Sequence, residues 1–356
     1  MKTLIIAEAG VNHNGSLELA LRLIEAAVAA GADVVKFQTF RADKVISRFA
    51  PKAEYQIQKA ADAKETQLEM LRKLELDLAA HRQMFSYCRE KNIEFLSTPD
   101  DADSLNLLVG LGVSRLKIGS GEITNAPLLL KMAQTGLPVI MSTGMATLEE
   151  IEAALGVLAF GYVRRDERPS LDNFQRALGE PEGQRILQER VTLLHCTTEY
   201  PAPFEDVNLR AMQTMAAAFG LPVGYSDHTS GIVVPLAAVA LGATVIEKHF
   251  TLDKDLPGPD HQASLEPEEL RDMIRGIRQV EAALGSLFKL PAPSELKNRE
   301  IVRRSLVAVH RIRRGERFSE DNLTSKRPGT GVSPMQYWDW LGKEAERNFG
   351  EDEGIS

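Results

Sequence analysis

The chain has 356 residues, 44% of them hydrophobic and 26% charged, which is the composition of a folded protein rather than a disordered one. Its formal net charge of −8 argues against a nucleic-acid binder or a membrane-surface binder, although local lysines could still bind an anionic small molecule. Two cysteines are too few for a disulfide framework, and no apolar run is long enough to span a membrane. The first residues, MKTLIIAEAG, are not typical of a secretory signal, so we expect a cytoplasmic protein.

Eight short apolar runs, rich in β-branched residues, alternate with amphipathic helical segments along residues 1–285. The runs are 4–9, 33–40, 94–99, 115–121, 138–144, 191–197, 222–228 and 244–250. Ser16 and Thr147 are helix-capping residue types at the start of two helical segments. This alternation predicts a (β/α)₈ barrel, because a doubly wound sheet usually has fewer strands and a glycine-rich turn after the first one.

Two segments interrupt the alternation, and the character of the chain changes after Gly285. Residues 41–76 predict a helical excursion, whereas the polar and charged segment 161–190 receives no role. Residues 286–298 are rich in proline and polar residues and predict a linker. Residues 299–356 predict a small β-rich domain, which is marginally stable alone and is therefore expected to pack against something else.

Polar residues stand near the carboxyl end of every predicted strand, where a barrel of this kind has its active site. Side chains along a strand alternate between its two faces, so residues two positions apart share a face. Three such pairs are expected to look into one cavity: Lys36 with Gln38, Ser226 with His228, and Glu247 with His249.

Lys36 and Lys117 would face this cavity from the second and fourth strands. With the hydroxyl groups of Ser120 and Ser142 and the nearby glycine amides, they indicate a site for a phosphate or a carboxylate. Two alternatives stay open at this point. Each lysine could pair with a buried carboxylate, or one lysine could form a Schiff base with a carbonyl substrate.

His228 and His249 end neighbouring strands, which lie about 4.8 Å apart in a sheet, so both imidazoles could reach one metal ion. Two protein ligands would leave positions for water and substrate, which fits a Lewis-acid role. The alternative is a pair of hydrogen-bonded histidines without a metal. Asp260 follows a rigid Pro-Gly-Pro and is expected to place a carboxylate over the barrel mouth, where it could meet sugar hydroxyls.

Taken together, these motifs make the chain resemble the sialic acid synthase family along nearly its whole length. The shared motifs include AEAGVNHNGS, VVKFQTF, KIGSGEITN, STGMAT, HCTTEYPAPFEDVNL, YSDHTSG, IEKHFTLD, GPDHQASLEPEEL and KRPGTGVSP. The resemblance implies a metal-dependent barrel followed by an antifreeze-like domain, also called the SAF domain. It also implies an enzyme that makes a nine-carbon keto acid from phosphoenolpyruvate and an N-acylated mannose-type sugar.

The resemblance further implies roles for individual residues. Lys36, Lys117 and Glu247 would be catalytic, and His228 and His249 would bind a divalent cation, Mn²⁺ or Mg²⁺. The residues implied at the phosphoenolpyruvate site are Lys36, Thr98, Lys117, Ser120, Ser142, Thr198 and Ser226. Those implied at the sugar site are Gln38, Tyr200, Glu247 and Asp260. In a domain-swapped homodimer, Arg327 of the tail would reach the barrel of the partner subunit.

The implied reaction joins C3 of phosphoenolpyruvate to the aldehyde of the open-chain sugar and releases phosphate by carbon–oxygen cleavage. Glu247 or the metal would activate the attacking water. N-acetylmannosamine, giving N-acetylneuraminate, is the leading expectation, and 2,4-diacetamido-2,4,6-trideoxymannose, giving legionaminate, is the alternative. The rivals are a Schiff-base aldolase, an octulosonate phosphate synthase and a non-catalytic antifreeze-like binding protein.

Overall fold

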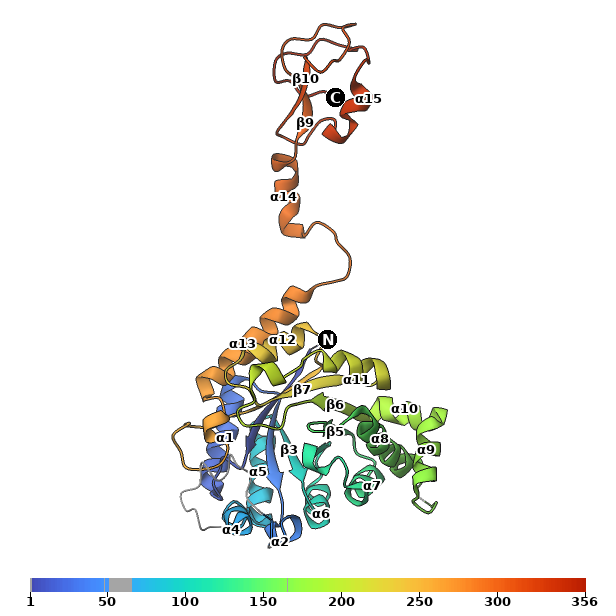
Figure 1. Cartoon of the computed structure of the whole chain (residues 1–356). Coiled ribbons are helices and arrows are strands. Elements are labelled where there is room, and N and C mark those ends of the chain that lie inside the picture. The colour runs from blue at the N-terminus through green and yellow to red at the C-terminus, as the bar shows by residue number, and fades with distance from the viewer. Residues whose placement is uncertain (1, 48, 51–65, 165) are drawn as a thin grey trace. The chain divides into compact units, whose positions relative to one another are not determined.

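The computed structural model describes residues 2–47, 49–50, 66–164 and 166–356. The chain divides into two units, Met1–Gly285 and Ser286–Ser356 (Figure 1). Among the described residues, no helix has the length and apolar character needed to cross a membrane.

The first unit is built on eight parallel strands that form one sheet in the order β3-β2-β1-β8-β7-β6-β5-β4 (Figure 1). The two strands at the ends of this order, β3 and β4, contact each other and close the sheet into a barrel. The expected (β/α)₈ fold is therefore confirmed. The strands are β1 Leu4–Gly10, β2 Val34–Thr39, β3 Glu94–Pro99, β4 Leu116–Ile118, β5 Val139–Ser142, β6 Val191–His195, β7 Val223–Asp227 and β8 Val245–His249.

Helices surround these strands, and two of them begin at the capping residues named in the sequence analysis. Ser16 caps the first helix by accepting a hydrogen bond from the backbone N–H of Leu19, and Thr147 forms a capping box with Glu150. The helices of this unit are α1 Leu17–Ala30, α2 Ala42–Val45, α4 Gln67–Arg72, α5 Leu78–Glu90, α6 Ala102–Leu111, α7 Ala126–Gln134, α8 Leu148–Val163, α9 Leu171–Gly179, α10 Pro181–Arg190, α11 Ala211–Phe219, α12 Val233–Ala240 and α13 Pro267–Leu284.

The interior of the barrel has an apolar layer below a polar one. The apolar layer consists of Ile6, Val34, Leu96, Ile140, Leu194 and Val245, all buried. Two residues further along the same strands or just past their ends stand Glu8, Lys36, Thr98, Ser142, Cys196 and Glu247. Because side chains two positions apart share a face, the second set also points inward, nearer the carboxyl ends of the strands. The strand pattern thus places a polar site directly above the apolar layer.

The two segments that interrupt the alternation contain helices among their described residues. Residues 161–190 hold the end of α8 and then α9 and α10, and Phe160 packs edge-to-face on Phe174 with ring centroids 5.2 Å apart. The excursion expected over 41–76 contains α2 and α4, and its residues 51–65 lie outside the described part of the chain.

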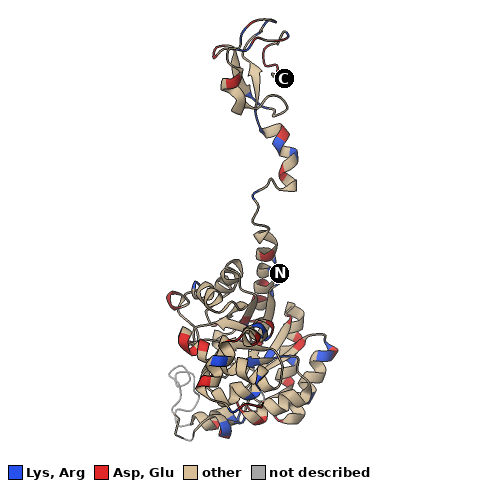
Figure 2. Ribbon diagram, turned by 90° about the vertical axis from the view of Figure 1, so that its right-hand side faces the viewer, with Lys and Arg blue, Asp and Glu red and all other residues tan. Residues whose placement is uncertain are grey.

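A helix overlaps the segment 286–298, for which the sequence predicts a linker. Helix α14, Pro293–Val302, includes residues 293–298 of that segment. Pro293 stands at the first helical turn, and Glu295 accepts a hydrogen bond from the backbone N–H of Ala292, so the local sequence favours a helix start there. Acidic and basic residues both lie along α14 (Figure 2).

The remainder of the second unit is the small β-rich domain expected from the sequence. Strands β9, Ser305–Ala308, and β10, Leu323–Lys326, pair antiparallel, and the short helix α15 spans Tyr337–Trp340. Its separate core includes buried Leu306, Phe318 and Phe349.

Candidate active site

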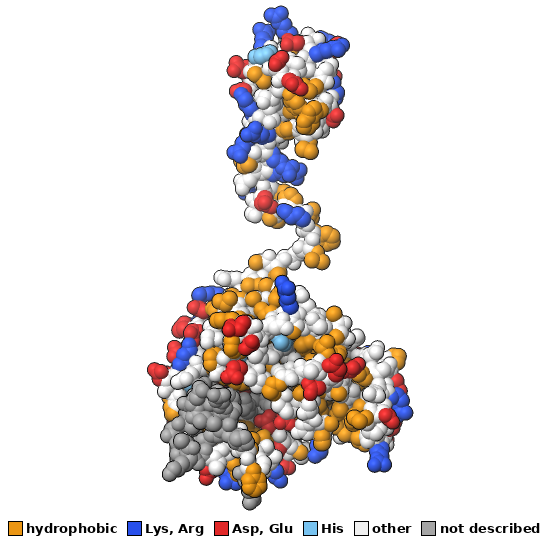
Figure 3. Space-filling view, viewed as in Figure 1, with side chains coloured by type: hydrophobic (Ala, Val, Ile, Leu, Met, Phe, Trp, Pro, Cys, Tyr) orange, Lys and Arg blue, Asp and Glu red, His pale blue; other side chains and the backbone are white. Residues whose placement is uncertain are grey.

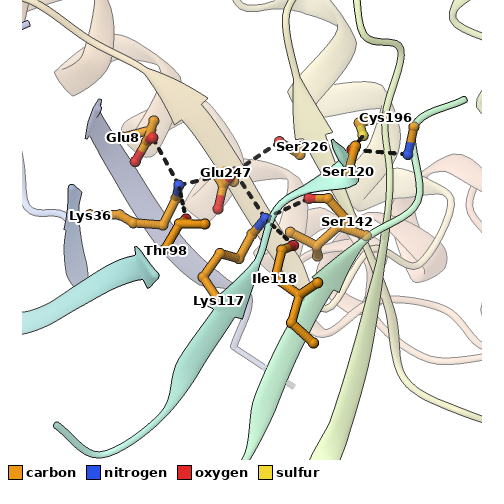
Figure 4. Close-up of polar contacts among 12 residues, drawn as sticks. Glu8, Lys36, Thr98, Lys117, Ile118, Ser120, Ser142, Cys196, Ser226 and Glu247 are labelled. Carbon is orange, nitrogen blue, oxygen red and sulfur yellow. Dashed lines mark hydrogen bonds and ion pairs between the residues drawn. The ribbon is translucent and has the colours of Figure 1, made fainter. Parts of the chain in front are cut away.

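Four buried charged side chains meet in the polar layer of the barrel (Figure 4). Lys36 Nζ lies 2.8 Å from Glu8 Oε1 and 3.8 Å from Glu247 Oε1, and Lys117 Nζ lies 3.7 Å from the same Glu247 oxygen. No side chain of this quartet is more than 5% exposed. The residues come from β1, β2, β4 and β8, so the closure of the barrel brings them together.

Hydroxyl groups surround the two lysines of the quartet. Lys36 Nζ donates to Thr98 Oγ1 at 3.3 Å, and Lys117 Nζ donates to Ser142 Oγ at 2.6 Å. Ser226 donates to Glu247 Oε1 at 3.0 Å. These contacts place five of the predicted phosphoenolpyruvate-site and catalytic residues in one cluster with Glu247.

The remaining hydroxyl groups of the expected anion site lie around Gly144, which follows β5. The Gly144 backbone N–H donates to Ser120 Oγ at 3.1 Å, and Ser120 Oγ lies 3.1 Å from Cys196 Sγ. A Cβ atom at Gly144 would lie 2.2 Å from Thr198 Oγ1 and 2.8 Å from Ser120 Oγ. A side chain at this position would therefore force these hydroxyl groups to move.

The pKa values of the two carboxyl groups in the quartet move in opposite directions. Burial, aided by the nearby Glu247 charge, raises the pKa of Glu8 to about 7 although Lys36 opposes the shift. Burial also acts to raise the pKa of Glu247, but Lys117 and Lys36 together hold it below its usual range. Burial lowers the pKa of Lys117, whereas Glu247 and Glu8 outweigh burial and raise the pKa of Lys36. Two carboxyl groups with separated pKa values are a common arrangement in acid–base sites.

His228 and His249 stand side by side at the ends of β7 and β8, with ring centroids 5.5 Å apart. Tyr200 packs against both rings, at centroid distances of 4.2 Å from His228 and 5.7 Å from His249. His228 Nδ1 lies 2.6 Å from the carbonyl oxygen of Thr197, so this hydrogen bond assigns the proton to Nδ1 and leaves Nε2 as the ligating nitrogen. Burial lowers the pKa of both histidines, which favours the neutral form that binds metals.

The donor set fits a divalent cation held by two histidines. His249 Nδ1 is buried and has no hydrogen-bond partner among the described residues. Within that same part of the chain, no three His, Cys, Asp or Glu side chains are grouped closely enough to hold a metal. Oxygen atoms from water or substrate would therefore complete the coordination, as a Lewis-acid role requires.

Several further polar atoms of the site are buried without a hydrogen-bond partner from the described residues. They are Glu8 Oε2, Glu247 Oε2 and Thr198 Oγ1. An unsatisfied buried polar group costs about 1–3 kcal/mol, so such a cluster is expected only where water or a ligand supplies the missing hydrogen bonds. The cavity is therefore suited to a polar ligand.

The remaining predicted residues differ in whether the structure brings them to the quartet. Gln38 donates to Glu8 Oε1 at 3.4 Å and so joins the quartet. Asp260 lies in the loop after β8 and is 8% exposed. Arg327 belongs to the second unit, which is described separately from the barrel.

Glu8 was considered from the sequence only as a buried carboxylate that could pair with a lysine, and no catalytic or binding role was predicted for it. The alternative that a lysine pairs with a buried carboxylate holds for Lys36, whose nearest carboxylate is Glu8. Glu8 follows Ile6 of the apolar layer by two positions, and the same alternation that singles out Lys36 could have identified it.

Comparison with known proteins finds a family match for each of the two units. The NeuB family matches residues 23–289, and the SAF domain matches residues 303–356. The chain is 54% identical to an N,N'-diacetyllegionaminic acid synthase of Campylobacter jejuni, over 99% of each protein. It is 46% identical to a protein of the same name from Legionella pneumophila, over 98% of this chain and 92% of that protein.

A solved structure supports the same placement. The crystal structure of an N-acetylneuraminic acid (sialic acid) synthetase from Leptospira borgpetersenii, in complex with citrate, matches with a TM-score of 0.67 and 34% identity. The match covers 84% of this chain and 90% of that one.

Proposed function

The chain belongs to the NeuB family, and from this premise we propose that it is a synthase of N,N'-diacetyllegionaminic acid. The proposed reaction condenses phosphoenolpyruvate with 2,4-diacetamido-2,4,6-trideoxymannose and releases phosphate. The observation that carries the choice of product is the 54% identity, over 99% of both proteins, to a relative of that name. Identity to the N-acetylneuraminic acid synthetase of known structure is 34%. The relatives therefore favour the legionaminate alternative over the N-acetylneuraminate that the sequence analysis put first.

We propose that phosphoenolpyruvate binds at the lysine end of the quartet. Lys36 and Lys117 are buried cations, and charge-assisted hydrogen bonds to carboxylate or phosphate are among the strongest that side chains make. Ser120, Ser142 and Thr198 add hydroxyl groups at the ends of neighbouring strands. Their arrangement supports an anion with two charged ends, such as an enol phosphate bearing a carboxylate.

The proposed condensation forms a bond between C3 of phosphoenolpyruvate and the aldehyde carbon of the open-chain sugar. The aldehyde oxygen takes up a proton and becomes a hydroxyl group, while C2 becomes a cation. Water adds at C2 and gives up a proton, and the tetrahedral centre then loses phosphate through cleavage of its C2–O bond. The remaining C2 hydroxyl proton leaves with the phosphate, so that a 2-keto acid results.

We propose that Glu247 accepts the proton that the attacking water loses. Its Oε1 is held by Ser226 and lies near both lysines, whereas its Oε2 has no partner among the residues described. The unpartnered oxygen is thus available to accept a proton at the point where two cations would bind the anion. Glu247 is a carboxylate in this arrangement because the lysines stabilise its charge.

His228 and His249 would hold the divalent cation, Mn²⁺ or Mg²⁺, at the mouth of the barrel. Such a cation polarises a carbonyl oxygen and so activates an aldehyde toward attack. Tyr200 packs on the ring of His228 and limits its rotation. Gln38, Tyr200 and Asp260 would bind the sugar from strands and loops on the same side.

We also propose that the enzyme is a domain-swapped homodimer in the cytoplasm, with Arg327 of one subunit reaching the site of the other. The segment that follows the barrel in the sequence contains the large hydrophobic residues Leu287, Phe288 and Leu290, and Figure 3 shows hydrophobic side chains along this segment. Apolar side chains in a connecting segment favour burial against another protein surface. Cys88 and Cys196 are free thiols, which fits a reducing compartment.

The proposal is tested by the initial rate of phosphate release from phosphoenolpyruvate with each of the two sugars, by the chelated and the Mn²⁺-loaded protein. We expect metal-dependent release, with a kcat/KM for the diacetamido sugar at least about 10-fold above that for N-acetylmannosamine. His249→Ala should lose the metal-dependent rate. A preference for N-acetylmannosamine would contradict the proposed product, and equal rates with chelator would contradict the metal site.

A further inference from the structure

A buried ion pair lies on the outer face of the barrel, directly behind the two histidines. Lys248 Nζ is 2.5 Å from Asp227 Oδ2, and both side chains are 0% exposed. The two residues are partners in the register of β7 and β8, and each precedes one of the histidines by one position. Because side chains alternate along a strand, the pair points toward the helices while His228 and His249 point into the barrel.

The ion pair also forms hydrogen bonds that fix the backbone around His228. Asp227 Oδ1 accepts hydrogen bonds from the backbone N–H of Thr229 at 3.0 Å and from its hydroxyl at 2.9 Å. Lys248 Nζ donates to the carbonyl oxygen of Thr229 at 2.5 Å. The residues on both sides of His228 are thus fixed to each other and to β8, the strand that carries His249.

Stability alone does not account for this arrangement. Removing two charges from water costs free energy, and the attraction between the charges often does no more than offset that cost. Well-packed apolar residues of similar volume frequently stabilise a fold as much as a buried ion pair does. A buried pair with two further hydrogen bonds does, however, fix geometry. Here the fixed geometry is the relative placement of the two histidines, since His228 is also held on the inner side by Thr197.

We propose that Asp227 and Lys248 are positioning residues that hold His228 and His249 at the separation needed to share one divalent cation. The inference rests on the metal site of the proposed function. Partners that orient metal ligands typically change metal affinity by about 10–100-fold when they are removed. The pair acts through the backbone on both sides of the ligands and not through contact with the cation.

The test is Mn²⁺ affinity, measured by electron paramagnetic resonance of free Mn²⁺, together with the thermal unfolding midpoint. The variant Asp227→Asn/Lys248→Met removes both charges, keeps the side-chain volume and retains an acceptor for Thr229. We expect its Mn²⁺ dissociation constant to rise at least about 10-fold while the unfolding midpoint moves by no more than about 3 °C. Thr229→Val removes one hydroxyl group without a charge and should raise the same constant severalfold.

The matched control is Arg115→Met, which breaks the partly exposed ion pair of Arg115 with Glu94 at the amino ends of β4 and β3. It should leave Mn²⁺ affinity unchanged, because this pair lies at the opposite end of the strands from the two histidines. A folded double variant with wild-type Mn²⁺ affinity would overturn the positioning role and leave the metal site standing. If the double variant does not fold, wild-type affinity in Thr229→Val overturns the role instead. Absence of Mn²⁺ binding by the wild-type protein would overturn the metal site and the inference together.

Discussion

Gly144→Ala adds one methyl group at the point where the hydroxyl groups of the proposed anion site converge. The new Cβ would lie 2.2 Å from Thr198 Oγ1, 2.8 Å from Ser120 Oγ and 2.9 Å from Cys196 Sγ. Contacts under 3.0 Å cannot be tolerated without movement, so Ser120 and Thr198 must shift. The effect is steric, because Gly144 does not have a left-handed backbone conformation.

The expected magnitude follows from the tightness of this contact. Adding a methyl group to a well-packed interior costs about 1–3 kcal/mol. Where substrate binding requires the displaced groups to return to their present positions, that cost lowers kcat/KM by about 5–150-fold. We expect the loss to appear mainly as a higher KM for phosphoenolpyruvate, with the KM for the sugar little changed. Initial rates of phosphate release with each substrate varied in turn measure both constants.

Gly121→Ala is the matched control for this experiment. Gly121 lies next to Ser120, but among the described residues nothing comes within 4 Å of a Cβ built there. Its kinetics should therefore stay near those of the wild-type protein. A Gly144→Ala enzyme with wild-type constants for phosphoenolpyruvate would refute the assignment of Ser120 and Thr198 to the anion site. Circular dichroism of both variants shows whether the fold is kept.

Three further predictions concern other parts of the molecule. Burial, with a smaller effect of His81, lowers the pKa of His13 from 6.5 to about 4. Between pH 6.5 and 4 the unfolded chain binds a proton at His13 that the folded protein does not bind. The free energy of unfolding therefore keeps its full value above pH 6.5 and falls by about 3 kcal/mol as the pH drops to 4. His13→Gln should remove that share of the pH dependence of the urea midpoint, and an unchanged slope would contradict it. Lys117→Met should lower kcat/KM for phosphoenolpyruvate by about 10–100-fold, since a hydrogen bond to a charged group is lost, and a near-normal value would exclude Lys117 from the anion site. Arg327→Ala should raise the KM for the sugar more than that for phosphoenolpyruvate, and an unaltered enzyme would show that the second unit does not complete the site.

The barrel and its polar layer could be predicted because they depend on simple periodicities. Strand alternation places Lys36 two residues after Val34 and Glu247 two residues after Val245, and in both cases an inward apolar residue is followed by an inward polar one. The proximity of His228 and His249 followed from their places at the ends of neighbouring strands. These predictions required only two pieces of information: which side chains of a strand point into the barrel, and which strands are neighbours.

The pairing within the site could not be predicted in the same way. Alternation does not say whether Lys36 meets Glu8, Glu247 or both, because that depends on the tilt and closure of the barrel. The opposite pKa shifts of Glu8 and Glu247 depend on how burial and several charges add at each carboxyl group. Both are properties of the assembled interior and not of any one strand.

The helices in 161–190 and helix α14 were not predicted, for a local reason. In 161–190 the apolar positions are few, but Ser170 caps α9 by accepting from the backbone N–H of Asn173, and Ala177 is buried. Residues 293–302 contain few apolar residues, so the amphipathic pattern that would predict a helix is weak. Capping residues and Pro293 were the available signals there.

The fate of the bridging oxygen of phosphoenolpyruvate tests the central claim most directly. The Mn²⁺-loaded protein would be incubated with 2,4-diacetamido-2,4,6-trideoxymannose and phosphoenolpyruvate carrying ¹⁸O between C2 and phosphorus, and both products would be analysed by mass spectrometry. The account predicts a product with the mass of N,N'-diacetyllegionaminic acid, free of label, and phosphate that carries the ¹⁸O. Label in the keto acid, or a keto acid formed from pyruvate without phosphate release, would contradict it.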